Sequence, residues 1–326
     1  MNVDMTPSGP DALEVLVQRM TPAAHDILEI ELRHPHGAPL PVFAAGAHID
    51  VHLPGGLVRQ YSLCSDPVER DRYLLGVQRA PASRGGSASF HDRVKPGDRL
   101  RISAPRNLFA LTAAPHSVLL AGGIGITPLL SMAAALHRMD ASFELHYCAR
   151  EARRLAFQER LHAVPWAARV RYHIDETANA PFDPVSILGA AGAGSHLYTC
   201  GPTGFMAAVV DAARASNWND NRVHLEHFGA PPVQTQANRS FVMRLAVTGI
   251  SIHVGAEESA LQALERSGID VPFSCEQGVC GTCLTRVIDG RPDHRDSFLN
   301  DAERARNDCF TPCCSRSCLR ELVLDL

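Results

Sequence analysis

Four cysteines near the end of the chain have the spacing of iron–sulfur ligands. The first three follow the pattern C-x4-C-x2-C, and the fourth comes after 29 intervening residues. A [2Fe–2S] cluster needs four thiolates, and this is the plant-type ferredoxin spacing. A structural zinc site is the alternative, although zinc sites usually contain C-x2-C pairs. The spacing predicts a [2Fe–2S] cluster held by Cys275, Cys280, Cys283 and Cys313.

The choice of the fourth ligand follows from local geometry. Cys314 adjoins Cys313, but adjacent side chains in an extended segment diverge, so only one of them should face the cluster. We expect Cys313 to be that ligand. Small residues between the ligands, such as Gly278, should let backbone N–H groups approach the cluster sulfurs. The remaining cysteines of this region and of the earlier chain are expected to be packing thiols: Cys64, Cys148, Cys309, Cys314 and Cys318.

A glycine-rich turn in the middle of the chain suits a phosphate. Its sequence, GGIGITP, spans residues 122–128 between an apolar run and a helical stretch. Glycines permit a tight turn and close approach of a pyrophosphate, whose charge is stabilised by N–H groups at a helix start. Thr127 suits the N-cap of that helix and Pro128 its first position. The turn lacks the GxGxxG pattern, so a standard Rossmann fingerprint is not predicted.

A second turn, at residues 200–202, should lie at the same edge of the sheet. It follows a later strand, and ligands of open α/β folds bind where the strands end. A purely structural turn and a buried strand-end thiol are the alternatives. The predicted nucleotide site comprises Gly122, Gly123, Gly125, Thr127, Pro128, Cys200, Gly201 and Pro202.

Two segments of the N-terminal region suit a second, planar and phosphorylated cofactor. In RQYS, residues 59–62, a guanidinium can bind phosphate, an aromatic ring can back a planar group and a hydroxyl can bond a ring nitrogen. In RGGS, residues 84–87, a cation and N–H groups can hold phosphate. An ordinary strand and a flexible surface loop are the alternatives. The predicted contacts are Arg59, Tyr61, Ser62, Arg84, Gly85, Gly86 and Ser87.

The elements that must position these residues fall into three groups. Short alternating apolar segments, such as residues 47–53, 72–78 and 99–103, predict an antiparallel β-barrel. From residue 117, strands alternate with helices, which predicts an α/β domain with a parallel sheet. The last region mixes alternating strands with one helix and is predicted to be α+β. The expected multidomain organisation is a barrel at 1–112, an α/β domain at 113–229, a linker at 230–240 and a cluster domain at 241–326.

The composition is that of a globular protein with several domains. The 326 residues are 45% hydrophobic and 20% charged, and no apolar run approaches the roughly 20 residues that cross a bilayer. The start of the sequence lacks the basic region and apolar core of a secretory signal. We therefore expect a soluble, cytoplasmic protein with reduced thiols. A net charge of −4 argues against nucleic acid and membrane partners.

In this order, the motifs resemble the phthalate dioxygenase reductase family, the reductase components of Rieske-type oxygenases. The resemblance covers essentially the whole chain and includes the segments HFG at 227–229 and ELVLDL at 321–326. It implies an FMN domain, an NAD domain and a plant-type (β-grasp) ferredoxin domain. It also implies that Arg59 and the Arg84 turn bind the FMN phosphate, that Tyr61 and Ser62 border the flavin, and that Phe228 stacks near it. Glu226 is similar to an acidic family position of uncertain role.

The implied activity is an oxidoreductase that passes electrons from NADH to FMN, then to the [2Fe–2S] cluster, then to a partner oxygenase. Nicotinamide delivers two electrons as hydride and the cluster accepts one, so a flavin must stand between them. No catalytic acid–base residue is expected, and the protein is expected to be a monomer. There are two alternatives: a redox sensor or binding protein without turnover, and an FAD enzyme that passes electrons to a cytochrome or to a hydroxylase of another type.

The preference for NADH over NADPH depends on two opposed groups of charges. Asp175 and Glu176 follow a strand and suit a ribose diol, which favours NADH. Arg150, Arg153 and Arg154 could instead hold the phosphate of NADPH. The sequence favours NADH and leaves the partner and its substrate open.

Overall fold

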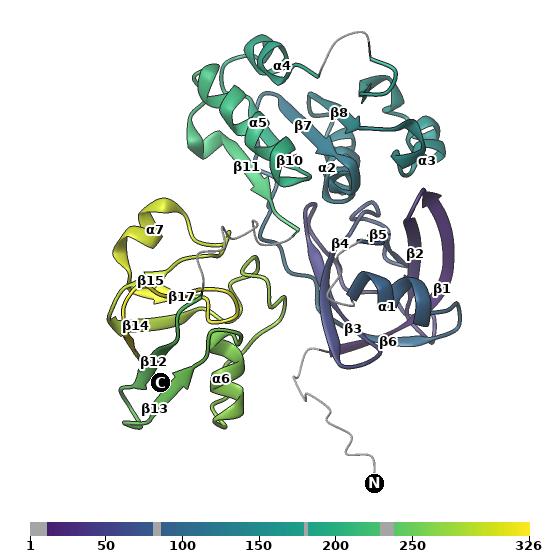
Figure 1. The fold of residues 1–326 in the computed structure, drawn as a ribbon. Coiled ribbons are helices and arrows are strands. Elements are labelled where there is room, and N and C mark those ends of the chain that lie inside the picture. Colours follow the sequence, from purple (N-terminus) through teal and green to yellow (C-terminus); the bar gives the residue numbers. More distant parts are fainter. Residues whose placement is uncertain (1–11, 81–85, 179–181, 229–237) are drawn as a thin grey trace. The chain divides into compact units, whose positions relative to one another are not determined.

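The computed structural model describes residues 12–80, 86–178, 182–228 and 238–326 (Figure 1). These described residues divide into two compact units, of which the first ends at Glu226 and the second begins at His227. Within the described ranges, no helix is both long and apolar enough to cross a membrane.

An antiparallel barrel opens the first unit. Its described strands form a six-stranded sheet in the order β4-β3-β6-β1-β2-β5, and a bridge between Leu63 and Leu75 brings the two ends of the sheet together. Alternate residues point inward, as a half-buried strand requires, and Val15, Ile30 and Ile49 are fully buried. The elements are β1 (Ala12–Ala24), β2 (Ile27–Arg33), β3 (His48–Leu53), β4 (Leu57–Ser62), β5 (Tyr73–Gln78), α1 (Gly86–Arg93) and β6 (Arg99–Ser103).

A parallel sheet with helices on both faces completes the first unit. In the described residues its strands have the order β11-β10-β7-β8-β9. The chain passes from β7 to β8 on one side and later to β10 on the other, so the ends of β7 and β10 lie at the switch point where such folds bind ligands. The strands are β7 (Ser117–Gly122), β8 (Phe143–Ala149), β9 (Val170–Ile174), β10 (His196–Cys200) and β11 (Val223–Glu226).

The helices of this sheet bury its apolar residues on two sides. One face packs against α2 and α3, and the other against α4 and α5 (Figure 1). The α-helices are α2 (Ile126–Arg138), α3 (Gln158–Ala163), α4 (Pro184–Ala190) and α5 (Thr203–Ala215). Short 3₁₀ turns are η1 (Gly123–Gly125), η2 (Ala152–Arg154), η3 (Ala167–Arg169) and η4 (Asp220–Arg222).

The barrel and the parallel sheet share one hydrophobic core. Barrel-side residues, including Ile27, Leu74 and Phe109, pack in the same cluster as Leu129 of α2 and Tyr147 of β8. Burial of apolar surface is the main stabilising contribution in folding, so this shared core ties the two sheets into one unit.

The second unit is an α+β domain. Its described strands form a sheet in the order β13-β12-β18-β14-β16, with β12 and β18 parallel and the other pairs antiparallel, and β15 pairs with β17. A capping box of Ser259 and Gln262 begins α6, which covers the sheet core. The elements are β12 (Phe241–Leu245), β13 (Ser251–Val254), α6 (Ala260–Arg266), β14 (Thr285–Asp289), β15 (Pro292–Asp293), α7 (Asp301–Arg306), β16 (Cys309–Phe310), β17 (Arg316–Ser317) and β18 (Glu321–Leu324).

Candidate functional site

The four predicted cluster ligands lie together in the second unit. Cys275, Cys280 and Cys283 are buried in the loop between α6 and β14, and Cys313 is half-buried between β16 and β17. Within the described ranges, no three His, Cys, Asp or Glu side chains converge as for a single metal ion. The thiols instead interact in two pairs, Cys275 with Cys280 and Cys283 with Cys313. Two thiolates for each of two irons is the ligand set of a [2Fe–2S] cluster, so the arrangement fits one.

In each pair, a hydrogen bond from one thiol stabilises the thiolate form of the other cysteine, and the thiolate is the form that binds metal. The Cys275 thiol lowers the pKa of Cys280 to about 5, and the Cys313 thiol lowers the pKa of Cys283. Backbone N–H groups also point at the sulfurs, as predicted: Gln277 N donates to Cys275 Sγ at 3.3 Å.

Close packing inside the ligand loop requires glycine at position 278. Gly278 has a φ of 68°, and a β-carbon there would stand 2.3 Å from Cys314 Sγ and 2.9 Å from Asp296 Cα. The 2% exposed Asp296 in turn accepts hydrogen bonds from Phe298 N and Leu299 N. The buried Asp296 carboxylate therefore holds the segment that packs against the ligand loop at Gly278.

Two predictions about the remaining cysteines are wrong. Cys313 and Cys314 lie in a turn rather than an extended segment, so their side chains do not diverge, and their thiols interact. Cys318 is exposed rather than packed, because it lies at the end of β17. Cys64 and Cys148 are buried as predicted, and Cys309 is half-buried.

The glycine-rich turn leads straight from β7 into α2. Gly123 to Gly125 form η1, and α2 begins at Ile126, one residue earlier than the predicted N-cap Thr127. The N-cap prediction is therefore wrong: Thr127 and Pro128 are inside the first turn of α2, and Thr127 Oγ1 donates back to Ile124 O at 3.1 Å. The continuous 3₁₀-to-α transition leaves no extended residue for a side-chain cap at Thr127.

The two predicted nucleotide turns pack against each other. A β-carbon on Gly125 would stand 2.1 Å from Cys200 O, and one on Gly201 would stand 2.9 Å from Gly122 Cα. Gly125 and Gly201 thus allow the two turns to pack closely. In the sequence analysis, the glycines were explained instead by the close approach of a pyrophosphate. Gly123, with a φ of 55°, faces no described atom within 4 Å, and Pro202 precedes α5 as its N-cap.

The predicted flavin residues lie at the end of β4 and the start of α1. Arg59 packs over Gly86, where a β-carbon would stand 2.5 Å from Arg59 Cγ. Tyr61 packs edge-on against Phe90 with ring centroids 5.2 Å apart, and burial raises its pKa. Ser87 Oγ accepts from a backbone N–H at 3.1 Å, whereas Arg84 and Gly85 lie outside the described residues. The Arg59 cation beside the start of α1 fits a flavin phosphate. The Tyr61 ring, held by Phe90, fits the flavin ring.

A carboxyl group joins this region to the nucleotide turns. Ser62 Oγ donates to Glu226 Oε2 at 3.0 Å. The Glu226 residue is half-buried, and protein surrounds its carboxyl group. Desolvation of the carboxyl group raises its pKa to about 8, although the hydrogen bond from Ser62 acts in the opposite direction. Burial, and then the Glu226 charge, raise the pKa of Cys200. Barrel, β10 and β11 thus meet at one point, which no local sequence signal indicated.

The residues considered for nucleotide preference lie at the C-terminal edge of the sheet. Glu176 N donates to Arg150 O at 3.0 Å. Arg153 forms an ion pair with Glu151, and Arg154 lies 3.5 Å from the same carboxylate.

Phe228 is 43% exposed and belongs to the second unit. Its predicted stacking near the flavin therefore remains a prediction.

Comparisons with known proteins extend over the whole chain. Residues 244–318 match the family described as 2Fe-2S iron-sulfur cluster binding domain. The chain is 50% identical to the vanillate O-demethylase oxidoreductase of Pseudomonas sp. (strain HR199 / DSM 7063), over 96% of this chain and 100% of the relative. It is 40% identical to the phthalate dioxygenase reductase of Burkholderia cepacia, over 98% and 99% of the two chains.

A solved structure supports the same relationship. The phthalate dioxygenase reductase described as a modular structure for electron transfer from pyridine nucleotides to [2Fe–2S] matches with a TM-score of 0.79 and 40% identity, over 97% of this chain and 98% of that one. Fold and site together define a flavin- and nicotinamide-dependent iron–sulfur oxidoreductase. The chain belongs to the phthalate dioxygenase reductase family, as its motifs predicted.

Proposed function

We propose that this protein is the reductase component of a Rieske-type oxygenase, carrying electrons from NADH through FMN and the [2Fe–2S] cluster to the oxygenase. The observation that carries the proposal is whole-length similarity to a vanillate O-demethylase oxidoreductase. The test is reconstitution: purified reductase, NADH and a Rieske-type oxygenase component from the same organism should convert an aromatic methoxy acid or a related substrate. An oxygenase that remains unreduced under these conditions would contradict the proposal.

The choice of FMN is supported by the Arg59 and α1 region. Arg59 would hold the phosphate together with the Arg84 turn and Ser87, while Tyr61 would border the ring and Ser62 bond its edge. The chemistry that a bound flavin supplies is exchange between a two-electron hydride and single electrons. Acid extraction should release one FMN per chain, and recovery of stoichiometric FAD would refute this choice.

The Ser62–Glu226 pair would control charge beside the incoming nicotinamide. With a pKa of about 8, the carboxyl group is mostly neutral at pH 7. A neutral group can hold a proton at Glu226 Oε1 or Oε2 and places no negative charge beside the hydride donor.

NADH is proposed over NADPH because Glu151 already pairs with Arg153 and Arg154, which leaves these cations less suited to a 2′-phosphate. Asp175 and Glu176 would meet the ribose diol. Comparison of kcat/KM for the two nucleotides tests this, and equal values would contradict it.

We also propose three functional domains: FMN-binding at 1–112, NAD-binding at 113–229 and a ferredoxin domain at 241–326 after a linker at 230–240. A complete electron path within one chain is consistent with a monomer, and thiolate ligands suit the reducing cytoplasm. Limited proteolysis should cut between 230 and 240, and light scattering should give one chain per particle.

A further inference from the structure

A barrel strand touches the nucleotide-binding turn at a residue without a side chain. Gly76 lies in β5, and a β-carbon built on it would stand 2.6 Å from Thr127 Cγ2, 2.9 Å from Phe157 Cζ and 3.2 Å from Ile124 Cδ1. Real β-carbons essentially never approach other heavy atoms within 3.0 Å. Gly76 is therefore a point at which the barrel limits the approach of the turn.

The three side chains that face Gly76 are held in place. Thr127 is 2% exposed, and its hydroxyl donates to Ile124 O. Phe157 is buried in the core shared by the barrel and the parallel sheet, and its backbone has a left-handed φ of 61°. Ile124 packs against the same core. Because packed interiors transmit strain, a side chain at position 76 would displace the turn as a whole.

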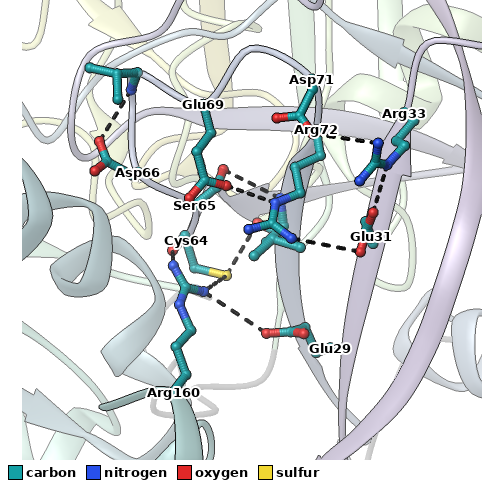
Figure 2. Close-up of polar contacts among 12 residues, drawn as sticks. Glu29, Glu31, Arg33, Cys64, Ser65, Asp66, Glu69, Asp71, Arg72 and Arg160 are labelled. Carbon is teal, nitrogen blue, oxygen red and sulfur yellow. Dashed lines mark hydrogen bonds and ion pairs between the residues drawn. The ribbon is translucent and has the colours of Figure 1, made fainter. Parts of the chain in front are cut away.

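Polar contacts hold the barrel against α2, which begins at the turn, and against α3. Arg160 of α3 donates from Nη2 to Cys64 O at 2.6 Å, and its Nη1 lies 3.9 Å from Glu29 Oε2 (Figure 2). In α2, Ser131 Oγ accepts from Gly46 N at 3.1 Å. Cys64 follows β4 and Gly46 precedes β3, so both contacts hold the open end of this hairpin, where His48 pairs with Ser62. The contact at Gly76 therefore cannot relax by hinge opening without breaking these bonds.

We propose that Gly76 is a positioning residue for hydride transfer: it fixes the separation between the nucleotide turn and the barrel edge that carries Ser62. The bridge from Leu63 to Leu75 places that edge directly beside β5. The inference rests on the proposed function, in which one hydride, two electrons with a proton, passes from the reduced nicotinamide to the oxidised flavin. Such transfer needs near-contact geometry, and a 1 Å displacement can cost about 100-fold in rate.

The experiment compares full-length Gly76→Ala with the parental protein by anaerobic stopped-flow at saturating NADH. The rate of flavin reduction should fall about 10- to 100-fold, while the NADH dissociation constant changes less than about threefold, because the turn and its nucleotide move together. Binding of NAD⁺ to the reduced protein should also give a weaker long-wavelength nicotinamide–flavin absorbance band. This band depends on ring separation and does not require turnover.

Rescue and a matched control make the result specific. Gly76→Ala/Thr127→Ser removes the closest methyl group and keeps the hydroxyl, while the 2.9 Å approach to Phe157 Cζ remains. It should therefore recover part of the rate and of the band relative to Thr127→Ser alone. Gly189→Ala, in α4 where an added β-carbon meets no described atom within 4 Å, should match the parent.

The outcomes separate this inference from the proposed function. Parental rate and band in Gly76→Ala would overturn the inference. If Gly76→Ala loses its flavin, the double variant decides: regained flavin and rate support the inference, and continued loss overturns it. A parental protein that does not reduce its flavin with NADH would instead overturn the proposed function.

Discussion

Replacement of Glu226 by Gln should remove a specific pH dependence from the stability of the first unit. Desolvation raises the pKa of this carboxyl group from 4.5 to about 8 in the folded protein. The folded state therefore binds more protons than the unfolded state between these values. The resulting stability is fully present below about pH 4.5 and is lost as pH rises through about 8.

The size of the effect follows from the shift. Each pH unit in this window costs about 1.4 kcal/mol, which gives a ceiling of about 5 kcal/mol. Glu226 is partly accessible, and solvent screening reduces the penalty, so we expect a loss of about 2–3 kcal/mol between pH 5 and pH 8.5. Glu226→Gln keeps an acceptor for Ser62 and does not titrate, so it should lack this component.

Tryptophan fluorescence isolates the relevant unit. The chain has two tryptophans, Trp166 and Trp218, and both belong to the first unit. Urea unfolding of full-length wild type and Glu226→Gln at several pH values gives the difference in unfolding free energy, in which other titrating groups cancel. A difference that stays constant from pH 5 to pH 8.5 would refute the assignment of a raised pKa to this carboxyl.

Four further substitutions test the two cofactor regions. Cys313→Ser should lower the iron and sulfide content and stop cytochrome c reduction, while NADH still bleaches the flavin. Cys314→Ser should keep both the cluster and cytochrome c reduction. A full cluster in Cys313→Ser would refute the ligand assignment. Gly125→Val should weaken NAD⁺ binding and lower the melting temperature, because its side chain must displace the Cys200 backbone; unchanged values in calorimetry would contradict this. Asp296→Ala should destabilise the second unit by about 1–3 kcal/mol, because the buried Leu299 N–H and the partly buried Phe298 N–H lose their acceptor. An unchanged denaturation midpoint for cluster release would argue against that role.

Local sequence patterns predicted the elements whose side chains repeat at short range. The alternating segments at residues 47–53 and 99–103 correspond to β3 and β6. The cysteine spacing identified the cluster region because all four ligands come from one short part of the chain. Such signals need no knowledge of distant contacts.

Contacts between distant segments could not be predicted in this way. The turns at 122–128 and 200–202 were predicted to share one edge of the sheet, but their direct contact through Gly125 and Cys200 was not. No residue pattern indicated that Gly76 packs against Thr127. Glu226 ends an unpredicted strand, and its raised pKa depends on packing around the carboxyl. The start of α2 was misplaced because η1 continues smoothly into the helix.

The central claim is that electrons enter from NADH at the flavin and leave through the [2Fe–2S] cluster. The most direct measurement is anaerobic titration of the full-length protein with NADH, followed by visible absorbance for the flavin and electron paramagnetic resonance for the reduced cluster. We expect flavin bleaching to precede a reduced-cluster signal that approaches one spin per chain, and we expect Cys313→Ser to bleach without that signal. A cluster that stays oxidised while the flavin is fully reduced, or a cluster reduced equally fast in flavin-depleted protein, would contradict it.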